Sequence, residues 1–251
     1  MSAPVNQTHP TGVDDLRRRL GFWLRCDPAR LLWPSRCLAC EADGEDGLDL
    51  CGPCVAALPW NASACGRCAQ PLPQPAEACG ACLSGHASAL TEVHAACLYA
   101  PPLDRLVLRF KFHGDLAAGR LLAQLMAQAF ADRPRPAALL PVPLHRSRLR
   151  QRGYDQALEL ARPLARSLDL PLLDGLLTRR HATEPQSQLD AAARKRNLKD
   201  AFHVQPSTLL PLHVTLVDDV MTTGATLQAA ALALRRAGVA RVDAWVCARV
   251  P

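Results

Sequence analysis

No uncharged apolar run in the sequence approaches the roughly 18 residues of a membrane-spanning helix, so we expect no transmembrane segment. Residues 1–23 lack both the continuous apolar core and the small-residue cleavage site of a signal peptide. We therefore expect the chain to work in the reducing cytoplasm. Hydrophobic and charged residues make up 49% and 21% of the chain, fractions that are typical of a folded protein and argue against disorder.

Lysine is also scarce. Only Lys111, Lys195 and Lys199 occur among 29 basic residues, so almost all of the positive charge is arginine. This pattern is typical of a compositional bias, although the guanidinium fork of arginine also binds phosphate in a bidentate manner. The formal net charge is +6, and eight cysteine thiolates around two zinc ions would lower it to about +2. Net charge alone therefore does not predict a nucleic-acid-binding protein.

Cysteine, by contrast, is abundant. The chain has 11, an odd number and a high one for a reducing compartment. Eight of them form four CxxC pairs whose first members lie 14 residues apart. Two residues between thiols let one tight turn direct both sulfurs at one ion, and two such turns complete a tetrahedron. The spacing predicts two closed, structural zinc sites built from Cys37, Cys40, Cys51, Cys54, Cys65, Cys68, Cys79 and Cys82.

The four pairs can be grouped into two sites in three ways. We favour the sequential grouping, first pair with second and third with fourth, because it keeps each loop short; a crossed grouping of first with third stays open. A redox role is the alternative for a lone CxxC, but four pairs in register make it remote. Of the other cysteines, Cys97 and Cys247 lie in apolar runs and are expected in the core, while Cys26 has no assignable role.

The rest of the chain divides into segments of different composition. We expect residues 1–30 to be loose or partly helical, residues 31–90 to form the zinc-binding module, and residues 91–251 to form one α/β domain. Within that domain, apolar strand-like runs alternate with helical patterns, which predicts a mainly parallel sheet flanked by helices. The expected strands are 94–100, 138–144, 170–177, 213–220 and 239–250, and the expected helices are 116–130, 155–168 and 226–238. A polar insert at 178–200 interrupts this pattern and is typical of a lid over a site.

The most informative motif spans residues 214–226. An apolar strand ends in Asp218 and Asp219, and a loop of small residues then opens a helix. Two adjacent carboxylates can accept hydrogen bonds from a vicinal diol, while backbone N–H groups and hydroxyls at a helix N-terminus can surround a phosphate. A simple helix cap would explain one aspartate or one threonine, but not both groups at the carboxyl end of a buried strand.

This motif resembles the 5-phosphoribosyl-1-pyrophosphate (PRPP) signature of type I phosphoribosyltransferases. The whole of residues 31–251 is similar to the ComF/GntX family, in which a double zinc ribbon precedes such a domain. The shared motifs are LLWPSRCLAC, the four CxxC pairs, FKFHGD, PVPLHRSRLRQRGYDQA, TEPQSQLDAAARKRN and LVDDVMTTGAT. The resemblance implies a fold of the type I phosphoribosyltransferase class and Mg²⁺ bound together with PRPP. It implies a PRPP site made of Asp218, Asp219, Val220, Met221, Thr222, Thr223, Gly224, Ala225 and Thr226.

The resemblance also assigns the neighbouring motifs. Residues 143–153 match the pyrophosphate loop, in which Arg148 and Arg152 fit the family's R-x-x-x-R-G spacing better than Arg146 and Arg150 do. With Asp218 and Asp219, they are the expected catalytic residues. The 178–200 insert matches a hood that closes over PRPP. The hood residues that match the family are Arg194, Arg196 and Lys199, expected near pyrophosphate, and Gln186, Gln188 and Asn197, without a role.

Three further points concern single residues. The family's Phe and Asn are replaced by Tyr154 and Asp155, and the added carboxylate is unfavourable near pyrophosphate unless Asp155 faces away or pairs with an arginine. Lys111 and His113 fall in a family segment, but a lone Lys and a lone His on a helix are typical of a surface, and we leave them out of the catalytic set. Thr222 stands where purine-salvage relatives carry an aspartate that handles the base, so no general base for a purine is visible.

Two functions follow from this resemblance. The first is transfer of a 5-phosphoribosyl group, with release of pyrophosphate, to an acceptor that no residue identifies. The second is a non-enzymatic adaptor, associated with competence, that handles single-stranded DNA or protein partners and keeps the PRPP site for sensing. Trp60 is the only aromatic residue between Cys37 and Cys82, so it offers little surface for stacking bases. The sequence does not indicate the oligomeric state.

Overall fold

The computed structural model describes residues 35–45, 47–85, 88–179, 201–206 and 209–251. The expectations for the N-terminal segment, for Cys26 and for hood residues 186–199 lie outside this range. Within it, no helix has both the length and the apolar character needed to cross a bilayer.

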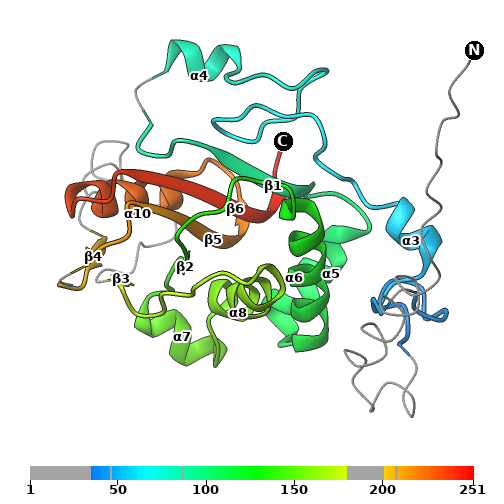
Figure 1. Cartoon of the computed structure of the whole chain (residues 1–251). Coiled ribbons are helices and arrows are strands. Elements are labelled where there is room, and N and C mark those ends of the chain that lie inside the picture. The colour runs from blue at the N-terminus through cyan, green and yellow to red at the C-terminus, as the bar shows by residue number, and fades with distance from the viewer. Residues whose placement is uncertain (1–34, 46, 86–87, 180–200, 207–208) are drawn as a thin grey trace, which may run out of the picture.

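A four-stranded sheet forms the centre of the molecule (Figure 1). It contains β1 (Val93–Leu98), β6 (Arg241–Arg249), β5 (His213–Met221) and β2 (Ala138–Pro141), in that spatial order. All three neighbouring pairs are parallel. The predicted α/β class with a mainly parallel sheet is therefore confirmed, and the carboxyl ends of the strands meet at one edge, where ligands bind in such folds.

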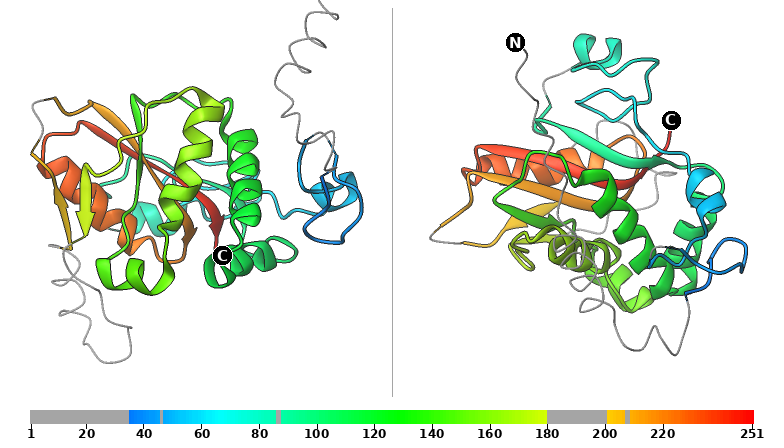
Figure 2. Two further views of the ribbon diagram at one scale, coloured as in Figure 1. Left: turned by 90° about the horizontal axis from the view of Figure 1, so that it is seen from below. Right: turned by 45° about the vertical axis from the view of Figure 1, so that its right-hand side comes forward.

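Helices cover both faces of the sheet (Figures 1 and 2). The core on one face is built from α5 (Leu103–His113), α6 (Leu116–Phe130) and α8 (Gln156–Leu168), and the core on the other contains α10 (Ala225–Arg236). Side chains alternate along each strand, so neighbours such as Val217 and Leu216 belong to opposite cores. The predicted helices at 116–130, 155–168 and 226–238 agree with α6, α8 and α10 to within two residues.

Two expectations were wrong. Residues 170–177 form a single bridge, Leu172 to Leu139, rather than a strand, because Pro171 has no N–H to donate and a turn at Gly175 (φ 86°) follows. Most of the expected loop at 143–153 is a helix, α7 (Arg146–Arg152). His145 caps the start of α7 by accepting a hydrogen bond from Ser147 N (3.2 Å), and the left-handed Gly153 ends it.

The base of the predicted hood is a two-stranded antiparallel ribbon. Its strands are β3 (Leu177–Arg179) and β4 (Phe202–Val204), which pair directly with each other. Because they flank the insert on both sides, they bring its two ends together next to the sheet.

The cysteine-rich segment is an internal duplication. In each copy the first CxxC lies in a turn, and the second begins a short helix, α3 (Gly52–Ala56) after Cys51 and α4 (Gly80–Ser84) after Cys79. Corresponding features recur 28 residues apart, twice the 14-residue step: left-handed residues at Glu41 and Ala69, and bridges that begin at Arg36 and Ala64. Figure 1 shows the two copies at different places, the first beside α5 and α6 and the second beside β1.

Candidate functional site

Each copy of the duplicated segment gathers four sulfurs. The two groups are Cys37, Cys40, Cys51 and Cys54, and Cys65, Cys68, Cys79 and Cys82, and within each group the sulfurs lie within 4.8 Å of one another. Sequential grouping is thus the one that the fold adopts. We call the two groups the first and the second zinc site.

The sulfur geometry fits zinc. Measured sulfur–sulfur distances are 3.6 Å for Cys40–Cys51, 3.9 Å for Cys65–Cys82 and 3.8 Å for Cys68–Cys79. Four sulfurs about 2.3 Å from one ion are about 3.8 Å apart. These distances are far too long for disulfides, and they match closed four-cysteine zinc sites.

Backbone N–H groups prepare one cysteine of each site as a thiolate. Burial acts to raise the pKa of Cys37, but backbone N–H groups, that of Cys51 first, lower it to about 6. In the second site burial again raises the pKa of Cys65, and backbone N–H groups lower it to about 7. The N–H of Cys79 donates to the sulfur of Cys65 at 3.1 Å. Thiolates are the form that binds zinc.

The acidic pair lies at the carboxyl end of β5. Alternation along the strand directs Asp219 to the face with Val217 and α5, and Asp218 to the opposite face. Lys111 of α5 reaches Asp219, with Nζ 2.8 Å from Oδ2. The lysine that we left out of the site is therefore part of it, and only its position in the FKFHGD segment pointed there.

The surroundings of Asp218 disfavour its ionisation. Burial first, and then the charge of Asp219, raise the pKa of Asp218 to about 8. One oxygen of Asp218 accepts a hydrogen bond from the backbone N–H of Asp219 at 2.9 Å. The pair is thus poorly solvated and carries less than two negative charges near neutral pH. Poorly solvated carboxylates are good acceptors for the hydroxyl groups of a ligand.

The loop after the acidic pair turns sharply into α10. Gly224 caps the helix with a left-handed φ of 75°, which residues other than glycine adopt only with strain. A Cβ on Gly224 would also lie 2.5 Å from Cε of Met221. Thr222 and Thr223 are exposed, and the Thr223 hydroxyl accepts a hydrogen bond from the N–H of Ala225, the first residue of α10 (3.4 Å). The arrangement fits a bound phosphate.

Three arginines, Arg148, Arg152 and Arg179, differ in their surroundings near the carboxyl ends of the strands. Burial first, and then the charge of Arg148, lower the pKa of Arg179 at the end of β3, whereas the charge of Asp218 raises it. Sequence reasoning did not single out Arg179. The guanidinium of Arg152 instead lies over the ring of Phe112, 5.7 Å from its centroid. Arg148 and Asp218 thus both lie close enough to Arg179 to shift its pKa.

The two departures from the family pattern have structural roles. Asp155 caps α8, with one oxygen accepting from Leu158 N (3.2 Å) and the other from Leu144 N (2.9 Å). Burial raises the pKa of Asp155. Both of its carboxylate oxygens accept hydrogen bonds from backbone N–H groups. The hydroxyl of Tyr154 donates to the carbonyl of Phe110 in α5. Tyr154 and Asp155 thus fasten this segment through hydrogen bonds to the backbone.

A cavity of about 550 Å³ opens between α7 and the β3–β4 ribbon. Its lining includes Arg146, Asp155, Thr178, Arg179 and His203. The cavity adjoins the carboxyl end of β2 at Pro141, which pairs with Val217 just before the acids. A polar space therefore lies beside the acidic pair, at the base of the predicted hood.

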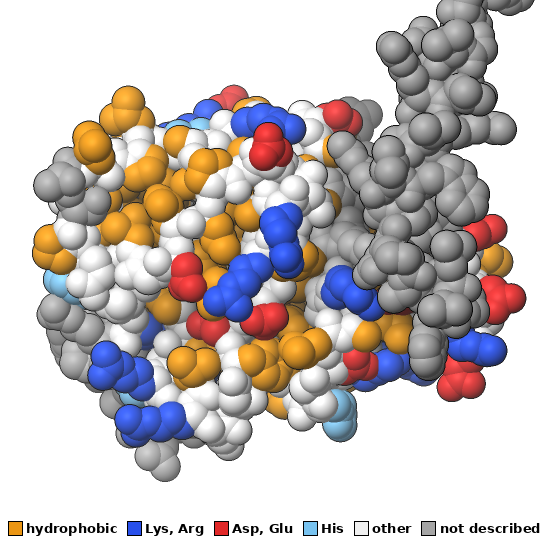
Figure 3. Space-filling view, turned by 60° about the horizontal axis from the view of Figure 1, so that its bottom comes forward, with side chains coloured by type: hydrophobic (Ala, Val, Ile, Leu, Met, Phe, Trp, Pro, Cys, Tyr) orange, Lys and Arg blue, Asp and Glu red, His pale blue; other side chains and the backbone are white. Residues whose placement is uncertain are grey.

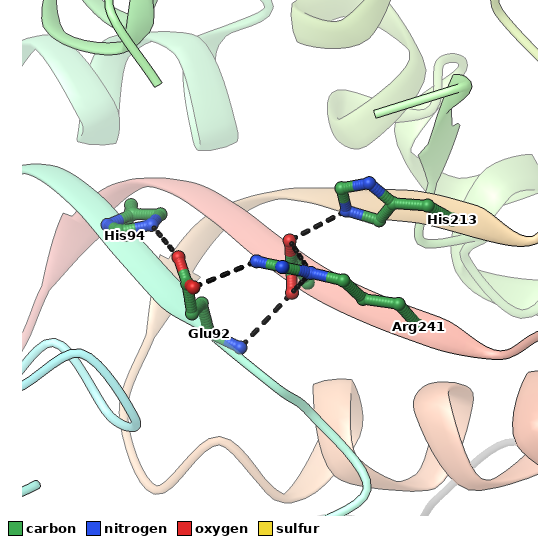
Figure 4. Close-up of polar contacts among 5 residues, drawn as sticks. Glu92, His94, His213 and Arg241 are labelled. Atoms are coloured by element: carbon green, nitrogen blue, oxygen red, sulfur yellow. Dashed lines mark hydrogen bonds and ion pairs between the residues drawn. The ribbon is translucent and has the colours of Figure 1, made fainter. Parts of the chain in front are cut away.

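A second polar cluster lies at the opposite edge of the sheet (Figure 4). The carboxylate of Asp243 is buried, and its Oδ2 is hydrogen-bonded to His213 Nε2 (2.7 Å) and Arg241 Nε (3.0 Å). Arg241 also pairs with Glu92 (2.8 Å), which contacts His94 (3.1 Å). These residues join the amino ends of β1, β5 and β6, so the cluster fastens the edge away from the site.

Comparison with known proteins agrees with this geometry. Residues 29–83 match the family model of the double zinc ribbon domain, and residues 155–251 match that of the phosphoribosyl transferase domain. In fold, the chain is thus a phosphoribosyltransferase-type domain that follows a double zinc ribbon.

Relatives narrow the class further. Competence protein F of Haemophilus influenzae is 40% identical over 159 residues, which cover 60% of this chain and 69% of the relative. DNA utilization protein YhgH of Salmonella typhi is 41% identical over 160 residues, with the same coverage. Competence protein ComFC of Bacillus subtilis is 30% identical over 144 residues, 57% of either chain. The chain belongs to the ComF family.

Proposed function

We propose that the chain binds PRPP and transfers its 5-phosphoribosyl group to an acceptor with release of pyrophosphate, in the cytoplasm. The observation that carries the proposal is the acidic pair at the end of β5, directly before a glycine loop that opens α10. Two poorly solvated carboxylates beside a helix N-terminus match a ribose diol that lies next to a phosphate.

Each part of the site has a proposed task. Asp218 and Asp219 accept hydrogen bonds from the two ribose hydroxyls, and the loop from Thr222 to Thr226 holds the 5′-phosphate. Lys111 forms an ion pair with Asp219 and offsets its negative charge. Arg148 and Arg179 supply positive charge where pyrophosphate departs. Bound to oxygens of PRPP, Mg²⁺ would further neutralise the pyrophosphate.

Breaking the anomeric C–O bond produces an oxocarbenium-like state, as in glycoside cleavage. Water must then be excluded, or the ribosyl group is hydrolysed instead of transferred. The β3–β4 ribbon lies at the edge of the 550 Å³ cavity, so an insert that folded over it would close the space above the acids. We propose the hood for this step.

Calorimetric titration of Mg²⁺·PRPP into the zinc-loaded protein tests the proposal. We expect micromolar binding in the wild type and at least about a 100-fold loss in the double variant Asp218→Asn, Asp219→Asn, because two charged hydrogen bonds disappear. Asp132→Asn, which removes an exposed carboxylate before β2, is the matched control and should bind as the wild type does. No binding by the folded, zinc-loaded wild type would refute the proposal.

A second candidate function is contact with single-stranded DNA. It is favoured by Phe112, which is 64% exposed and carries the guanidinium of Arg152 on its ring, next to the arginines of α7. Exposed aromatic rings and arginines are the elements of single-strand binding, and relatives are named for competence and DNA utilization. Figure 3 shows that basic groups on this side of the molecule are separated by acidic and apolar ones, rather than forming one continuous track.

Fluorescence anisotropy with a labelled oligothymidylate tests this candidate. Binding should weaken steeply as salt rises, and Phe112→Ala should weaken it about tenfold through lost stacking. Phe112→Tyr keeps the ring and is the control. Binding that ignores both salt and Phe112 would refute the candidate.

A further inference from the structure

The side chain of Arg249, at the carboxyl end of β6, joins two parts of the molecule that are far apart in sequence. Its Nε donates a hydrogen bond to the carbonyl oxygen of Cys68 (3.1 Å), and one Nη donates to Oε1 of Gln70 (3.0 Å). The other Nη donates to the carbonyl oxygens of Met221 (3.4 Å) and Val250. One guanidinium thus spans the second zinc site and the start of the phosphate-binding loop.

On the zinc side, Arg249 holds a turn that is strained by itself. Ala69 adopts a left-handed φ of 53°, which is unfavourable for a residue with a Cβ. Its neighbours Cys68 and Gln70 are the residues that Arg249 holds, and the N–H of Ala69 donates to the carbonyl of Cys65 (2.8 Å). Since Cys65 and Cys68 are both ligands of the second site, the metal and Arg249 fix the same turn.

On the loop side, Arg249 acts through Met221. The carbonyl of Met221 accepts from Arg249 and also from the N–H of Val250 (3.0 Å). The side chain of Met221 packs so closely on Gly224 that a Cβ there would lie 2.5 Å from its Cε. A shift of Met221 therefore moves the residue that caps α10 and orients the N–H groups for phosphate.

A separate contact supports the same connection. Gln228, in the first turns of α10, accepts from the N–H of Ala89 (3.0 Å) and donates to the hydroxyl of Ser88 (2.5 Å). These two residues follow the second zinc site in the chain. The first site is held elsewhere: Arg109 of α5 donates to the carbonyl of Leu38 (2.6 Å), and Arg120 of α6 pairs with Asp49 (3.3 Å).

We infer that Arg249 is a positioning residue that couples zinc in the second site to phosphate binding by the loop from Met221 to Thr226. Zinc holds the Cys65–Gln70 turn, the turn holds Arg249, and Arg249 holds Met221 in the position that the loop requires. The inference rests on the proposed function, because PRPP supplies the phosphate. Coupling is reciprocal: bound PRPP tightens zinc binding in the second site by the same factor by which zinc tightens PRPP binding, about tenfold.

The first experiment measures each zinc site separately. Zinc-loaded protein is incubated with a chelator and an alkylating reagent, with and without Mg²⁺·PRPP, and mass spectrometry of peptides follows the alkylation of the two sets of cysteines. In the wild type we expect PRPP to slow alkylation of the second set about tenfold and to change the first set little. In Arg249→Lys, which keeps the charge but loses the fork that contacts both sides, this protection should disappear. Arg120→Lys, the matched change at the first site, should keep it.

The second experiment needs no PRPP. Hydrogen exchange of residues 221–226 should be about tenfold faster in Arg249→Lys than in the wild type and unchanged in Arg120→Lys. Gln70→Ala, which removes a single contact of Arg249, should have a smaller effect in the same direction and serves if the lysine variant does not fold with two zinc ions.

The outcomes separate the two claims. Equal exchange of residues 221–226 in the wild type and both variants overturns the coupling, even where PRPP binds. Faster exchange in Arg249→Lys, in a protein whose wild type does not bind PRPP, supports the connection from zinc site to loop and refutes the proposed function instead.

Discussion

Replacing Asp218 by asparagine should make the protein more stable while it abolishes PRPP binding. Asp218 is half-buried beside a second carboxylate, and its pKa is raised from 3.8 to about 8, by burial first and Asp219 second. Asparagine is nearly isosteric and keeps the oxygen that accepts the backbone N–H of Asp219. The variant therefore removes a charge that the fold accommodates badly and keeps the local hydrogen bond.

The sign and size of the effect follow from proton linkage. A carboxyl whose folded pKa is raised destabilises the folded state as the pH rises from its unfolded pKa, near 4, to its folded pKa, near 8, because the unfolded chain releases the proton first. Each unit in this window corresponds to at most about 1.4 kcal/mol. Water reaches part of the side chain, so we expect about half of that. Between pH 6 and pH 8 the variant should then gain about 1.4 kcal/mol on the wild type, or about 3–5 °C in Tm.

Thermal unfolding of both proteins at several pH values between 6 and 8.5 checks this expectation. The comparison stays above the range in which acid removes zinc from thiolates, and any residual effect on the zinc sites is common to both proteins. The gap in Tm should widen steadily up to about pH 8 and then stay constant. A gap that does not change with pH, or a variant less stable than the wild type at pH 8.5, would refute the reasoning.

Three other predictions concern charge pairs and zinc. Lys111→Met should lower the free energy of unfolding by about 3 kcal/mol at pH 8, since Asp219 loses its partner, and adding Asp219→Asn should restore most of it; urea titrations of the four proteins measure this, and additive effects would contradict it. Asp243→Asn should cost about 3 kcal/mol, because His213 and Arg241 lose a buried carboxylate, and an unchanged urea midpoint would argue against the role of the cluster. Elemental analysis should find two zinc ions per chain and one after Cys82→Ser, and two ions in that variant would show that its site does not need Cys82 as a ligand.

The parts of the molecule that could be predicted from sequence are those whose chemistry is local. Cysteine spacing fixes two tight turns per site, and an apolar strand followed by acids, small residues and a helix specifies the phosphate loop within 13 residues. The same locality explains the two wrong expectations. The α7 segment has one apolar residue, Leu149, and so lacks a hydrophobic period; its helix depends on caps at both ends. The 170–177 run has the apolar composition of a strand, but Pro171 interrupts its N–H groups and a turn at Gly175 follows.

The missed residues all act across long sequence separations. Lys111 looks like an ordinary residue at the end of an amphipathic helix until α5 packs on the sheet beside Asp219. Arg179 lies at the end of β3, and only the fold of the β3–β4 ribbon brings it close enough to Arg148 and Asp218 for their charges to shift its pKa. Arg249 is the last residue of β6, and its side chain contacts Cys68 of the second zinc site. Each is a single charged side chain, and no local pattern distinguishes it from the other 26 basic residues.

The position of β6 has a consequence for how the molecule is made. It is the last of the four sheet strands along the chain, yet it lies between β1 and β5 and pairs with both. During synthesis β1 leaves the ribosome about 150 residues ahead of β6, its partner in the sheet. Until then its backbone partners in the described structure come from the residues before it, such as Pro59, whose carbonyl accepts from Leu98 N (2.8 Å). The second zinc module is complete before that moment and already bonds the start of β1, through Val93 N and Gly66 O (2.8 Å). In a cell that is short of zinc, the second zinc module would not support the start of β1 while β6 is still unmade. An exposed strand edge of this kind favours aggregation.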